Sequence, residues 1–444
     1  IIGKQGVEMS YEKYLRGIKG TEFIQKDRFN RDMGKYKDGE LDIPSISGKD
    51  LTITIDSKLQ EYGETLMKNK KGAIVAIEPN SGEILSLVSS PSYNPNLLVG
   101  RERSKNYLEL YKDSIYRPLI DKGLLSMFPP GSPFKILVGL TALQEKIITE
   151  KSTIYCKGYY IYGKEKRKMN CHCGGGYRNI YNAISLSCNS YFADIYRKTI
   201  DSQHNTKERF DNWSNHIKSF GLGNYLNNDL SVGKKGVVPD SEYYDRWYPD
   251  FKWGATTTIS NSIGQGEILT TPIQLANMTA AIANGGYYYT PHIIKKIDGD
   301  TIDVRFKTPI KTSIDSIHFK TMDKALYKVF ESGTGKLLNV PGIEICGKSG
   351  TAENFVKING VKTQLSDHSI FIAYAPKENP TIAISVLIEN AGYGSLWAGR
   401  TASLMIEKYI NHEISLKKME KTILNRSLKK EYLKPYLGKP FNIN

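Results

Sequence analysis

The sequence contains no hydrophobic run long enough to span a membrane. Its longest apolar segments, Ile136 to Leu143 and Thr381 to Ile388, hold about eight residues each, whereas a bilayer-spanning helix needs roughly 20. The chain also lacks a positively charged, apolar leader, and its first residue is Ile1 rather than Met. We therefore expect the 444 residues to be a soluble piece of a longer protein whose anchor or signal has been removed.

Internal repeats, low-complexity stretches and RNA-binding signatures are missing as well. Lys and Arg outnumber Asp and Glu by 61 to 46, which gives a formal net charge of +15. Such an excess can attract nucleic acid, an anionic membrane or a phosphate-bearing substrate. The basic residues are nevertheless scattered, and they become dense only after about His412. We interpret them as a solvated surface, predict no nucleic-acid partner, and expect the tail to be a solvated helix end.

The chain is rich enough in apolar residues to bury a large core, with 40% hydrophobic and 11% aromatic residues. Its middle, residues 100–330, is more helical in pattern, and turn residues from Pro79 to Gly82 join two strands into a hairpin. Strands at both ends around a helical middle predict one α+β domain with a sheet assembled from distant segments. Alternating or apolar runs predict these strands at residues 51–55, 72–78, 83–88, 368–374 and 382–388.

The composition changes at two places and divides the chain into three segments. Residues 1–47 are polar and rich in glycine, and we interpret them as the remnant of an N-terminal domain and its linker. Residues 48–411 carry the strand and helix patterns of the core. Residues 412–444 form the basic C-terminal tail.

Ser132 and Lys135 stand three residues apart at the start of an apolar helical segment. On a helix the two side chains share a face. A serine hydroxyl is a weak nucleophile until a base takes its proton. Lysine can be that base if burial or a second cation lowers its pKa from about 10.4. Alone, this pair is common, and a capping serine followed by a surface lysine is the ordinary alternative.

Two further motifs change that interpretation. The triplet Ser187-Cys188-Asn189 follows a helical stretch, and Lys348-Ser349-Gly350-Thr351 lies in a strand-like run. A serine-lysine pair, a serine triplet and a hydroxyl-rich lysine strand, in this order, are typical of serine acyl transferases that act on D-Ala-D-Ala peptides and β-lactams. The ordered set predicts an acyl-enzyme mechanism.

With these motifs in place, the sequence resembles the class B penicillin-binding proteins, the D,D-transpeptidases of the bacterial cell wall. Within that family it looks most like penicillin-binding protein 2, the elongation type, because of Asp367-His368 and the cysteines described below. The resemblance implies a penicillin-binding, serine β-lactamase-like α+β fold: an antiparallel sheet with helices on both faces, a helical subdomain and a short, extended N-terminal pedestal remnant. It covers residues 1 to about 411 and is carried by segments 6–16, 72–85, 91–96 and 263–266.

The resemblance also implies roles for the first two motifs. Ser132 would attack the carbonyl of the penultimate D-Ala of a stem peptide while Lys135 takes its proton. Ser187 would relay a proton to the departing amine, and Asn189 would bind the peptide backbone and orient Lys135. The family usually has threonine where this chain has Pro133. We expect the proline to be tolerated in the first turn of a helix, although it biases Ser132 away from helical ψ.

The third motif would bind the substrate and stabilise charge. Lys348 would supply positive charge, and the hydroxyls of Ser349 and Thr351, in the same strand as Gly350, would meet the substrate carboxylate. The backbone N–H groups of Ser132 and Thr351 would form an oxyanion hole. An amine on a neighbouring stem peptide would then attack the acyl-enzyme and complete the cross-link.

Four of the five cysteines fall within one 33-residue stretch. Clustered thiolates suit a tetrahedral Zn²⁺, while disulfides in an oxidising compartment and buried free thiols are the alternatives. Proteins similar to penicillin-binding protein 2 carry a zinc site here, so the resemblance implies a structural zinc that would pin the Ser187 loop. The expected ligands are Cys156, Cys171, Cys173 and Cys188, with His172 as the alternative to one of them.

The resemblance favours one function and leaves two others open. The favoured one is a peptidoglycan D,D-transpeptidase that β-lactams acylate, that needs no catalytic cofactor and that works in cell elongation and cell shape. The second is a β-lactamase or D,D-carboxypeptidase of the same fold. A second carboxylate triplet is missing and the 1–47 extension is present, and both observations disfavour it. The third is a β-lactam sensor that is acylated without turnover.

The resemblance further implies where the full-length protein works and with what. A missing N-terminal helix would anchor it in the inner membrane, with the catalytic part on the periplasmic face. Stem peptides and β-lactams would be its small partners. A glycosyltransferase of the elongation machinery and scaffold proteins would be its protein partners.

Overall fold

The computed structural model describes residues 3–201, 205–358 and 361–436. Its central sheet has five antiparallel strands in the order β13-β16-β17-β4-β5. The sheet joins strands from both ends of the chain, which confirms the predicted α+β class. The strands are β4 (Gly72–Ile77), β5 (Ile84–Ser90), β13 (Cys346–Ala352), β16 (His368–Ala375) and β17 (Ile382–Ile388).

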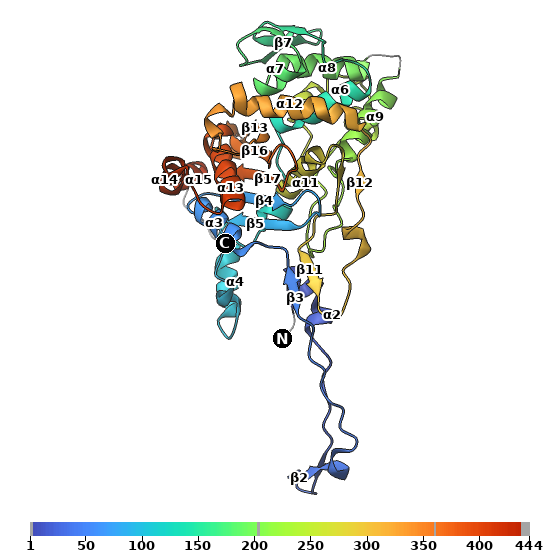
Figure 1. Ribbon diagram of the computed structural model, residues 1–444, viewed down its shortest axis with the longest axis vertical. Helices are drawn as coiled ribbons and strands as arrows, with labels where there is room; N and C mark the ends of the chain where they lie inside the picture. The colour runs from blue at the N-terminus through green and yellow to red at the C-terminus, as the bar shows by residue number, and fades with distance from the viewer. Residues whose placement is uncertain (1–2, 202–204, 359–360, 437–444) are drawn as a thin grey trace.

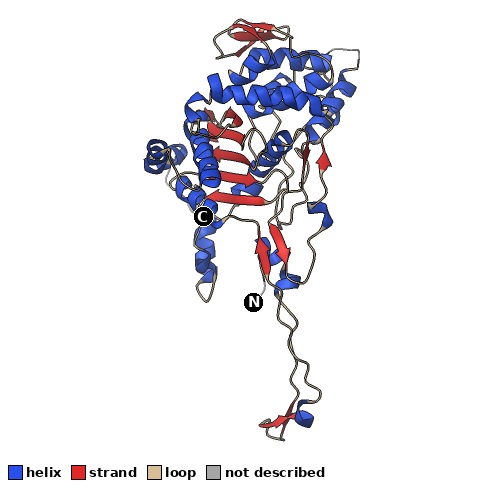
Figure 2. Cartoon of the chain, in the orientation of Figure 1, coloured by secondary structure: helices blue, strands red, loops and turns tan. Residues whose placement is uncertain are grey.

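Helices cover both faces of this sheet (Figure 1, Figure 2). Neighbouring residues of β5 point to opposite faces, so Val88 lies against Gly63 on one side while Leu87 lies against Gly123 on the other. None of the described helices is long and apolar enough to cross a bilayer. The covering helices are α3 (Ser57–Met67) and α13 (Arg400–Asn411), then α5 (Lys122–Leu125) and α11 (Pro272–Ala283).

A helical subdomain lies beyond the β13 edge of the sheet (Figure 1). Its centre is aromatic: the ring of Trp213 lies 6.0 Å from that of Phe134 and 5.2 Å from that of Phe210. Burial of such rings is among the largest single contributions to a core, and here it fixes the segment that follows Ser132. The helices are α6 (Lys135–Gln144), α7 (Ile180–Ser185), α8 (Asn189–Asp201), α9 (Thr206–Lys218), α10 (Ser241–Trp247) and α12 (Ser316–Ser332).

The N-terminal segment leaves the body as a long, thin arm (Figure 1). Its base is held by Tyr11, whose hydroxyl donates a hydrogen bond to the buried Asp229 carboxylate at 2.7 Å. Along the arm, apolar side chains such as Ile18, Phe29 and Ile46 are about 60% exposed. Its elements are α1 (Gly6–Ser10), α2 (Glu12–Leu15), β1 (Ile24–Lys26), β2 (Asp32–Lys35) and β3 (Leu51–Ile53), which pairs with β11 (Ile294–Ile297).

The basic tail packs against the body, which corrects the prediction of a solvated helix end. Ile423 of α14 (Lys417–Asn425) is fully buried. In α15 (Lys429–Leu433), the hydroxyl of Tyr432 accepts a hydrogen bond from the Lys71 N–H at 2.7 Å and donates one to Glu389 O at 3.2 Å. Because lysines dominate the composition of this segment, its composition did not reveal the few apolar residues that pack it against the body. The remaining short elements are α4 (Arg103–Lys112), β10 (Tyr287–Tyr288), β12 (Ile310–Lys311), β14 (Phe355–Ile358) and β15 (Val361–Gln364).

Candidate active site

Ser132 begins η3 (Ser132–Phe134), a 3-10 turn that continues directly into α6. Gly131 precedes it with φ 62° and ψ −148°, a conformation that is essentially restricted to glycine. A Cβ at this position would stand 2.9 Å from the Thr351 carbonyl oxygen. The glycine therefore allows the serine turn to lie directly against β13.

Pro133 fits the turn that follows the serine. It occupies the start of η3 and is buried, and a missing N–H leaves no broken hydrogen bond in the first turn of a helix. Its ring lies against β13, because a Cβ on Gly350 would come within 2.5 Å of Pro133 Cδ. This contact gives a steric reason for glycine at position 350.

The hydroxyl of Ser187 connects Ser132 to Lys135. Ser187 Oγ donates a hydrogen bond to Ser132 Oγ at 2.9 Å, and Lys135 Nζ donates to Ser187 Oγ at 3.2 Å. The same amine donates to Ser187 O at 2.9 Å and to Asn189 Oδ1 at 2.5 Å. The structure thus brings the first two motifs together across 55 residues of sequence. The described hydrogen bonds connect Lys135 to Ser132 through the hydroxyl of Ser187.

Ser187 is held in an unusual backbone conformation. It sits in the short link between α7 and α8 with φ 55°. Non-glycine residues rarely adopt positive φ, and where they do the surrounding structure imposes it, often at functional sites. The hydrogen bond from Lys135 to Ser187 O and the buried Cys188 that follows supply that constraint. Asn189 then starts α8, so its side chain is fixed from the first turn of a helix.

The two lysines of the site are buried, whereas its hydroxyl groups are partly exposed. Burial lowers the pKa of Lys135 to about 8, and negative charge on Cys171 and Cys188 acts in the opposite direction. Burial also holds the pKa of Lys348 well below its usual range, and the nearby Lys135 lowers it further. Desolvation and like charge both disfavour the protonated amine. A neutral amine can therefore exist beside hydroxyl groups that a ligand can reach.

The lysine motif occupies the edge strand of the sheet, β13, which hydrogen-bonds to β16. Alternation along the strand leaves Ser349 and Thr351 partly exposed on one face, while Lys348 Nζ donates to Ser349 O at 3.0 Å. The backbone of Thr351 faces the turn at Gly131. All three sequence motifs therefore meet in one place.

Two further residues of the site were not singled out by the sequence analysis. Thr334 Oγ1 lies 2.9 Å from Ser349 Oγ in a hydrogen bond, and Gln265 Nε2 donates to Thr351 O at 3.2 Å. The available signal was the pair of glycines around Gln265, which adopt φ values of 69° and 77° and allow the glutamine to approach β13. Glycine pairs are too common to identify a cleft residue by themselves.

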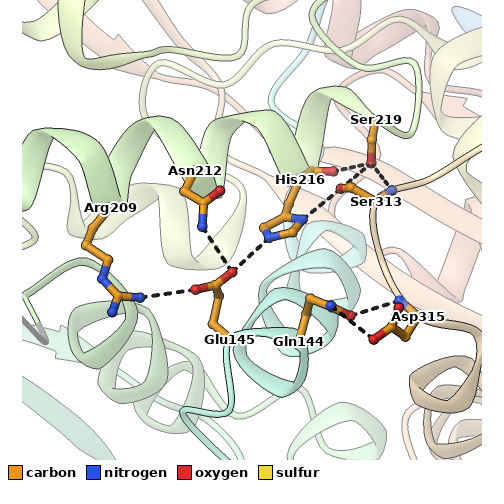
Figure 3. Close-up of polar contacts among 8 residues, drawn as sticks. All are labelled: Gln144, Glu145, Arg209, Asn212, His216, Ser219, Ser313 and Asp315. Carbon is orange, nitrogen blue, oxygen red and sulfur yellow. Dashed lines mark hydrogen bonds and ion pairs between the residues drawn. The ribbon is translucent and has the colours of Figure 1, made fainter.

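The far end of α6 is fixed as firmly as the end that carries the serine (Figure 3). Glu145, which ends the helix, accepts hydrogen bonds from Arg209 at 3.1 Å and Asn212 at 3.0 Å, and it contacts His216 Nε2 at 3.0 Å. His216 Nδ1 in turn contacts Ser313 Oγ at 2.7 Å. Helix α6 is anchored at both ends, which limits how far Lys135 can move.

The four clustered cysteines converge at the base of α8. All four are buried, and their sulfur atoms lie within 4.8 Å of one another. Asn189 N–H donates to Cys171 Sγ at 3.1 Å and Gly158 N–H donates to Cys156 Sγ at 3.3 Å. His172, the alternative ligand, is exposed and lies outside the group. The members of the group are the four predicted ligands: Cys156, Cys171, Cys173 and Cys188.

The spacing of these sulfurs fits a tetrahedral metal better than a disulfide. Neighbouring sulfurs are 3.5, 3.6 and 3.7 Å apart, and all four cysteines are free. A disulfide requires about 2.05 Å. Four thiolates around Zn²⁺ at about 2.3 Å would stand roughly 3.8 Å apart. The hydrogen bond between Cys171 and Cys188 lowers the pKa of Cys171 and raises the pKa of Cys188, so the pair holds one thiolate, the form that binds a metal.

Two models of known protein families match the chain. The family model described as the penicillin-binding protein transpeptidase domain matches residues 72–407, and the model of the penicillin-binding protein dimerisation domain matches residues 1–53. The chain belongs to the penicillin-binding transpeptidase family. All three motifs of this family member fall inside the transpeptidase match, and the arm falls inside the dimerisation match.

Particular relatives point to the elongation-type branch. The peptidoglycan D,D-transpeptidase MrdA of Haemophilus influenzae is 32% identical over 429 residues, which are 93% of this chain and 63% of that protein. The crystal structure of Pseudomonas aeruginosa PBP2 in complex with WCK 5153 matches with a TM-score of 0.76 and 32% identity, over 92% of this chain and 82% of that one. These similarities confirm the resemblance to penicillin-binding protein 2.

A third relative is solved together with another protein. PBP2 of Helicobacter pylori in complex with MreC matches with a TM-score of 0.74 and 27% identity, over 92% of this chain and 72% of that one. This member of the family therefore shares its fold along almost its whole length with these two structures. It spans less than two thirds of the curated Haemophilus relative.

Proposed function

We propose that the chain is the catalytic part of a peptidoglycan D,D-transpeptidase that β-lactams acylate. The observation that carries this proposal is the hydrogen-bonded set of Ser132, Ser187, Lys135 and Asn189 in front of β13. It places a nucleophile, a proton path and a buried amine of lowered pKa within one cleft. Membership of the family and similarity to MrdA point to the same reaction.

In the proposed reaction, Ser132 Oγ attacks the carbonyl carbon of the penultimate D-Ala. The proton leaves Ser132 through the Ser187 hydroxyl, which accepts it as it passes its own proton to the neutral Lys135 amine. This path uses the two observed contacts with their donors reversed, because a neutral Lys135 amine accepts from Ser187 Oγ, and Ser132 Oγ then donates to Ser187 Oγ. The amine later returns a proton to the nitrogen of the departing D-Ala, so the C–N bond breaks without a free amide anion. An ester between Ser132 and the peptide remains.

The strand β13 takes the complementary role of binding. Its exposed face offers the hydroxyls of Ser349 and Thr351 to the carboxylate of the substrate, with Lys348 behind them as a source of charge. In this proposal the N–H groups of Ser132 and Thr351 donate to the carbonyl oxygen as it becomes an oxyanion. An amine on a second stem peptide then attacks the ester, which restores the Ser132 hydroxyl and forms the cross-link.

The hydrolytic alternative lacks a base in the described contacts. The side chains hydrogen-bonded to Ser132, Lys135 and Ser187 are hydroxyl, amine and amide groups. A β-lactamase needs a further group, commonly a carboxylate, that activates water toward the acyl-enzyme. The contacts therefore favour transfer of the acyl group to an amine over hydrolysis. A β-lactam sensor would differ from the transpeptidase only in having no acceptor amine for the acyl group.

The experiment is intact mass spectrometry after mixing with benzylpenicillin. We expect a stable adduct on the parent chain, a more slowly formed but equally stable adduct on Ser349→Ala, which loses only a carboxylate-binding hydroxyl, and none on Ser132→Ala. An adduct that persists on Ser132→Ala contradicts the proposal, as does the absence of any adduct on the folded parent. Loss of the adduct within seconds supports a β-lactamase. Joining of a D-Ala-D-Ala stem peptide to an amine acceptor then separates the transpeptidase from the sensor.

We also propose that the four-cysteine group holds one structural Zn²⁺. The supporting observations are the sulfur spacing, the burial and the hydrogen bonds to sulfur. Bound there, the metal would act as a structural cross-link, since four thiolates fill its coordination and leave no place for water. Asn189 donates its N–H to Cys171, so the group would fix the start of α8 and, with it, the orientation of Lys135.

The expected location and protein partners belong to this proposal as well. We propose that the longer protein is anchored in the inner membrane and that the catalytic part works on its periplasmic face. The complex of the Helicobacter pylori relative with MreC supports a scaffold protein of that kind as one partner. A glycosyltransferase of the elongation machinery is the second expected partner. Co-purification of the full-length protein with each candidate tests these partners.

A further inference from the structure

A small lobe of residues 154–178, here called the tyrosine lobe, projects at the opposite end of the molecule from the N-terminal arm (Figure 1). It consists of two antiparallel pairs, β6 with β9 and β7 with β8. The cysteine group lies at its base, because Cys156 ends β6 and Cys171 follows β8 directly. The strands are β6 (Ile154–Cys156), β7 (Tyr159–Tyr162), β8 (Arg167–Asn170) and β9 (Gly176–Arg178).

The tyrosine lobe concentrates positive charge and aromatic rings. Its 25 residues contain six basic side chains, one acidic side chain and five tyrosines. Sequence analysis had treated these lysines as part of a scattered surface, because the strands that gather them could not be seen. Two of the rings, Tyr155 and Tyr177, are 55% and 71% exposed with centroids 5.0 Å apart. Exposed apolar and aromatic side chains that gather on one face commonly mark a binding surface.

The register of β7 and β8 separates an inner face from an outer face. Tyr160 and Met169 are paired and pack against the core. On the other face Tyr159 pairs with Asn170 and Ile161 pairs with Lys168. Ile161 is 52% exposed, and Lys168 Nζ stands 4.3 Å from the ring centroid of Tyr159. The outer face is therefore a row of one ring, one aliphatic side chain and one cation.

This outer face begins at the active site. Asn170 O, at the end of β8, accepts a hydrogen bond from Asn189 Nδ2 at 2.8 Å. The other end of the same amide, Asn189 Oδ1, holds Lys135. From Asn170 the face continues through Tyr159 and Lys168 toward the turn that joins β7 to β8. A polymer whose reacting end occupies the cleft can leave it along this face.

We propose that the outer face of the tyrosine lobe binds the peptidoglycan strand that carries a reacting stem peptide. This inference rests on the proposed transpeptidase function and adds a binding surface to it. A peptidoglycan strand is a chain of sugar rings with peptide carboxylates. Sugar rings pack against aromatic and apolar side chains, which the half-buried ring of Tyr159 and the exposed Ile161 supply. The carboxylates are complementary to Lys168 and to the other basic side chains of the lobe.

The experiment compares binding of a polymer with acylation by a small molecule. Co-sedimentation with purified, insoluble peptidoglycan measures the polymer, and the second-order rate of acylation by benzylpenicillin measures the cleft. The double variant Tyr159→Ala/Lys168→Gln should bind peptidoglycan about three- to tenfold more weakly per side chain removed. Its acylation rate should equal that of the parent, because benzylpenicillin is too small to reach the lobe.

Two controls make the outcome specific. Lys13→Gln removes a lysine that stands 4.5 Å over Tyr14 in the N-terminal arm, so it deletes the same charge and the same type of contact elsewhere. Vesicles containing phosphatidylglycerol test whether the lobe prefers a membrane surface. Lys168→Gln alone, which shortens an exposed side chain, replaces the double variant if that variant does not fold.

The inference is supported if peptidoglycan binding falls in the lobe variant alone. It is overturned if binding is unchanged, if Lys13→Gln lowers it equally, or if the lobe variant loses vesicle binding but keeps peptidoglycan binding. Failure of the transpeptidase proposal looks different, because benzylpenicillin would then fail to acylate the parent.

Discussion

Acylation of Ser132 should accelerate as the pH rises from 6 to 8. Lys135 accepts a proton only as a neutral amine, and burial lowers its pKa to about 8. Roughly one molecule in a hundred then carries the neutral amine at pH 6, about one in ten at pH 7 and about half at pH 8. A lysine with the ordinary pKa of about 10.4 would be neutral in roughly one molecule in 2,500 at pH 7. Burial thus raises the fraction of usable base about 200-fold at that pH.

The assay is stopped-flow measurement of the second-order acylation rate with a fluorescent penicillin between pH 6 and 9. We expect the rate to rise about tenfold from pH 6 to 7, about fivefold from pH 7 to 8, and then to level off. Lys135→Ala should lower the rate by about 10²-fold or more and remove the slope. Ser349→Ala should keep the same midpoint, because Lys135 stays buried. A rate that is flat or falls between pH 6 and 8 would refute the assignment of Lys135 as the base.

Three further predictions follow from single contacts. Gly131→Ala should abolish rapid acylation and lower stability by about 1–2 kcal/mol, since its φ of 62° and the 2.9 Å approach to Thr351 O exclude a methyl group; parent-like acylation kinetics contradict this. Cys156→Ser should reduce bound zinc, measured by elemental analysis, from about one per chain to below half and lower the melting temperature; a metal-free parent would disprove the zinc site. Tyr432→Phe, which loses the hydrogen bonds to Lys71 N and Glu389 O, should lower the free energy of unfolding by about 1–3 kcal/mol in urea titrations. The matched change Tyr181→Phe, which loses one hydrogen bond to Glu150 outside the tail, should cost less, and an equal or larger cost contradicts the tail as a packed element.

The tail shows what composition conceals. Its lysines predict a solvated surface, and those that the structure describes are indeed exposed, but a helix is held in place by the face it buries rather than by its average composition. Ile423 and Tyr432 decide the packing of α14 and α15. The hydrogen-bond partners of Tyr432, Lys71 and Glu389, are more than 40 residues away in sequence. No local sequence pattern therefore predicts this contact.

The cysteines show the opposite case. Their clustering in sequence and the family resemblance predicted these four cysteines as ligands, with His172 as the alternative to one of them, and the fold brings the four sulfurs within 4.8 Å. Strand β6, the end of β8 and the start of α8 each contribute one or two of them. The zinc itself stays a prediction, because sulfur spacing describes a site and not its occupant.

The catalytic motifs could be found in the sequence because each is a short local pattern. Catalysis requires certain residue types at a fixed spacing on one helix or strand, and this spacing can be seen in the sequence. Ser132 and Lys135 are spaced for a helix, and Ser349 and Thr351 are spaced for a strand. Strands β4, β16 and β17 were also predictable, because strands buried on both faces appear as short runs rich in apolar residues. The strand predicted at 51–55 instead pairs with β11 outside the central sheet.

Only the tertiary structure decided how these patterns act together. The hydroxyl of Ser187 comes between Ser132 and Lys135, the amide of Gln265 reaches Thr351, and the tyrosine lobe contacts Asn189 through Asn170 O. Each is a contact between segments far apart in sequence, and its geometry depends on the packing of whole elements. The same is true of the pKa of Lys135, because desolvation depends on every atom that excludes water from the amine. The sequence determined which groups this protein brings to its site, and the fold determined their protonation, their order and the surface that leads away from them.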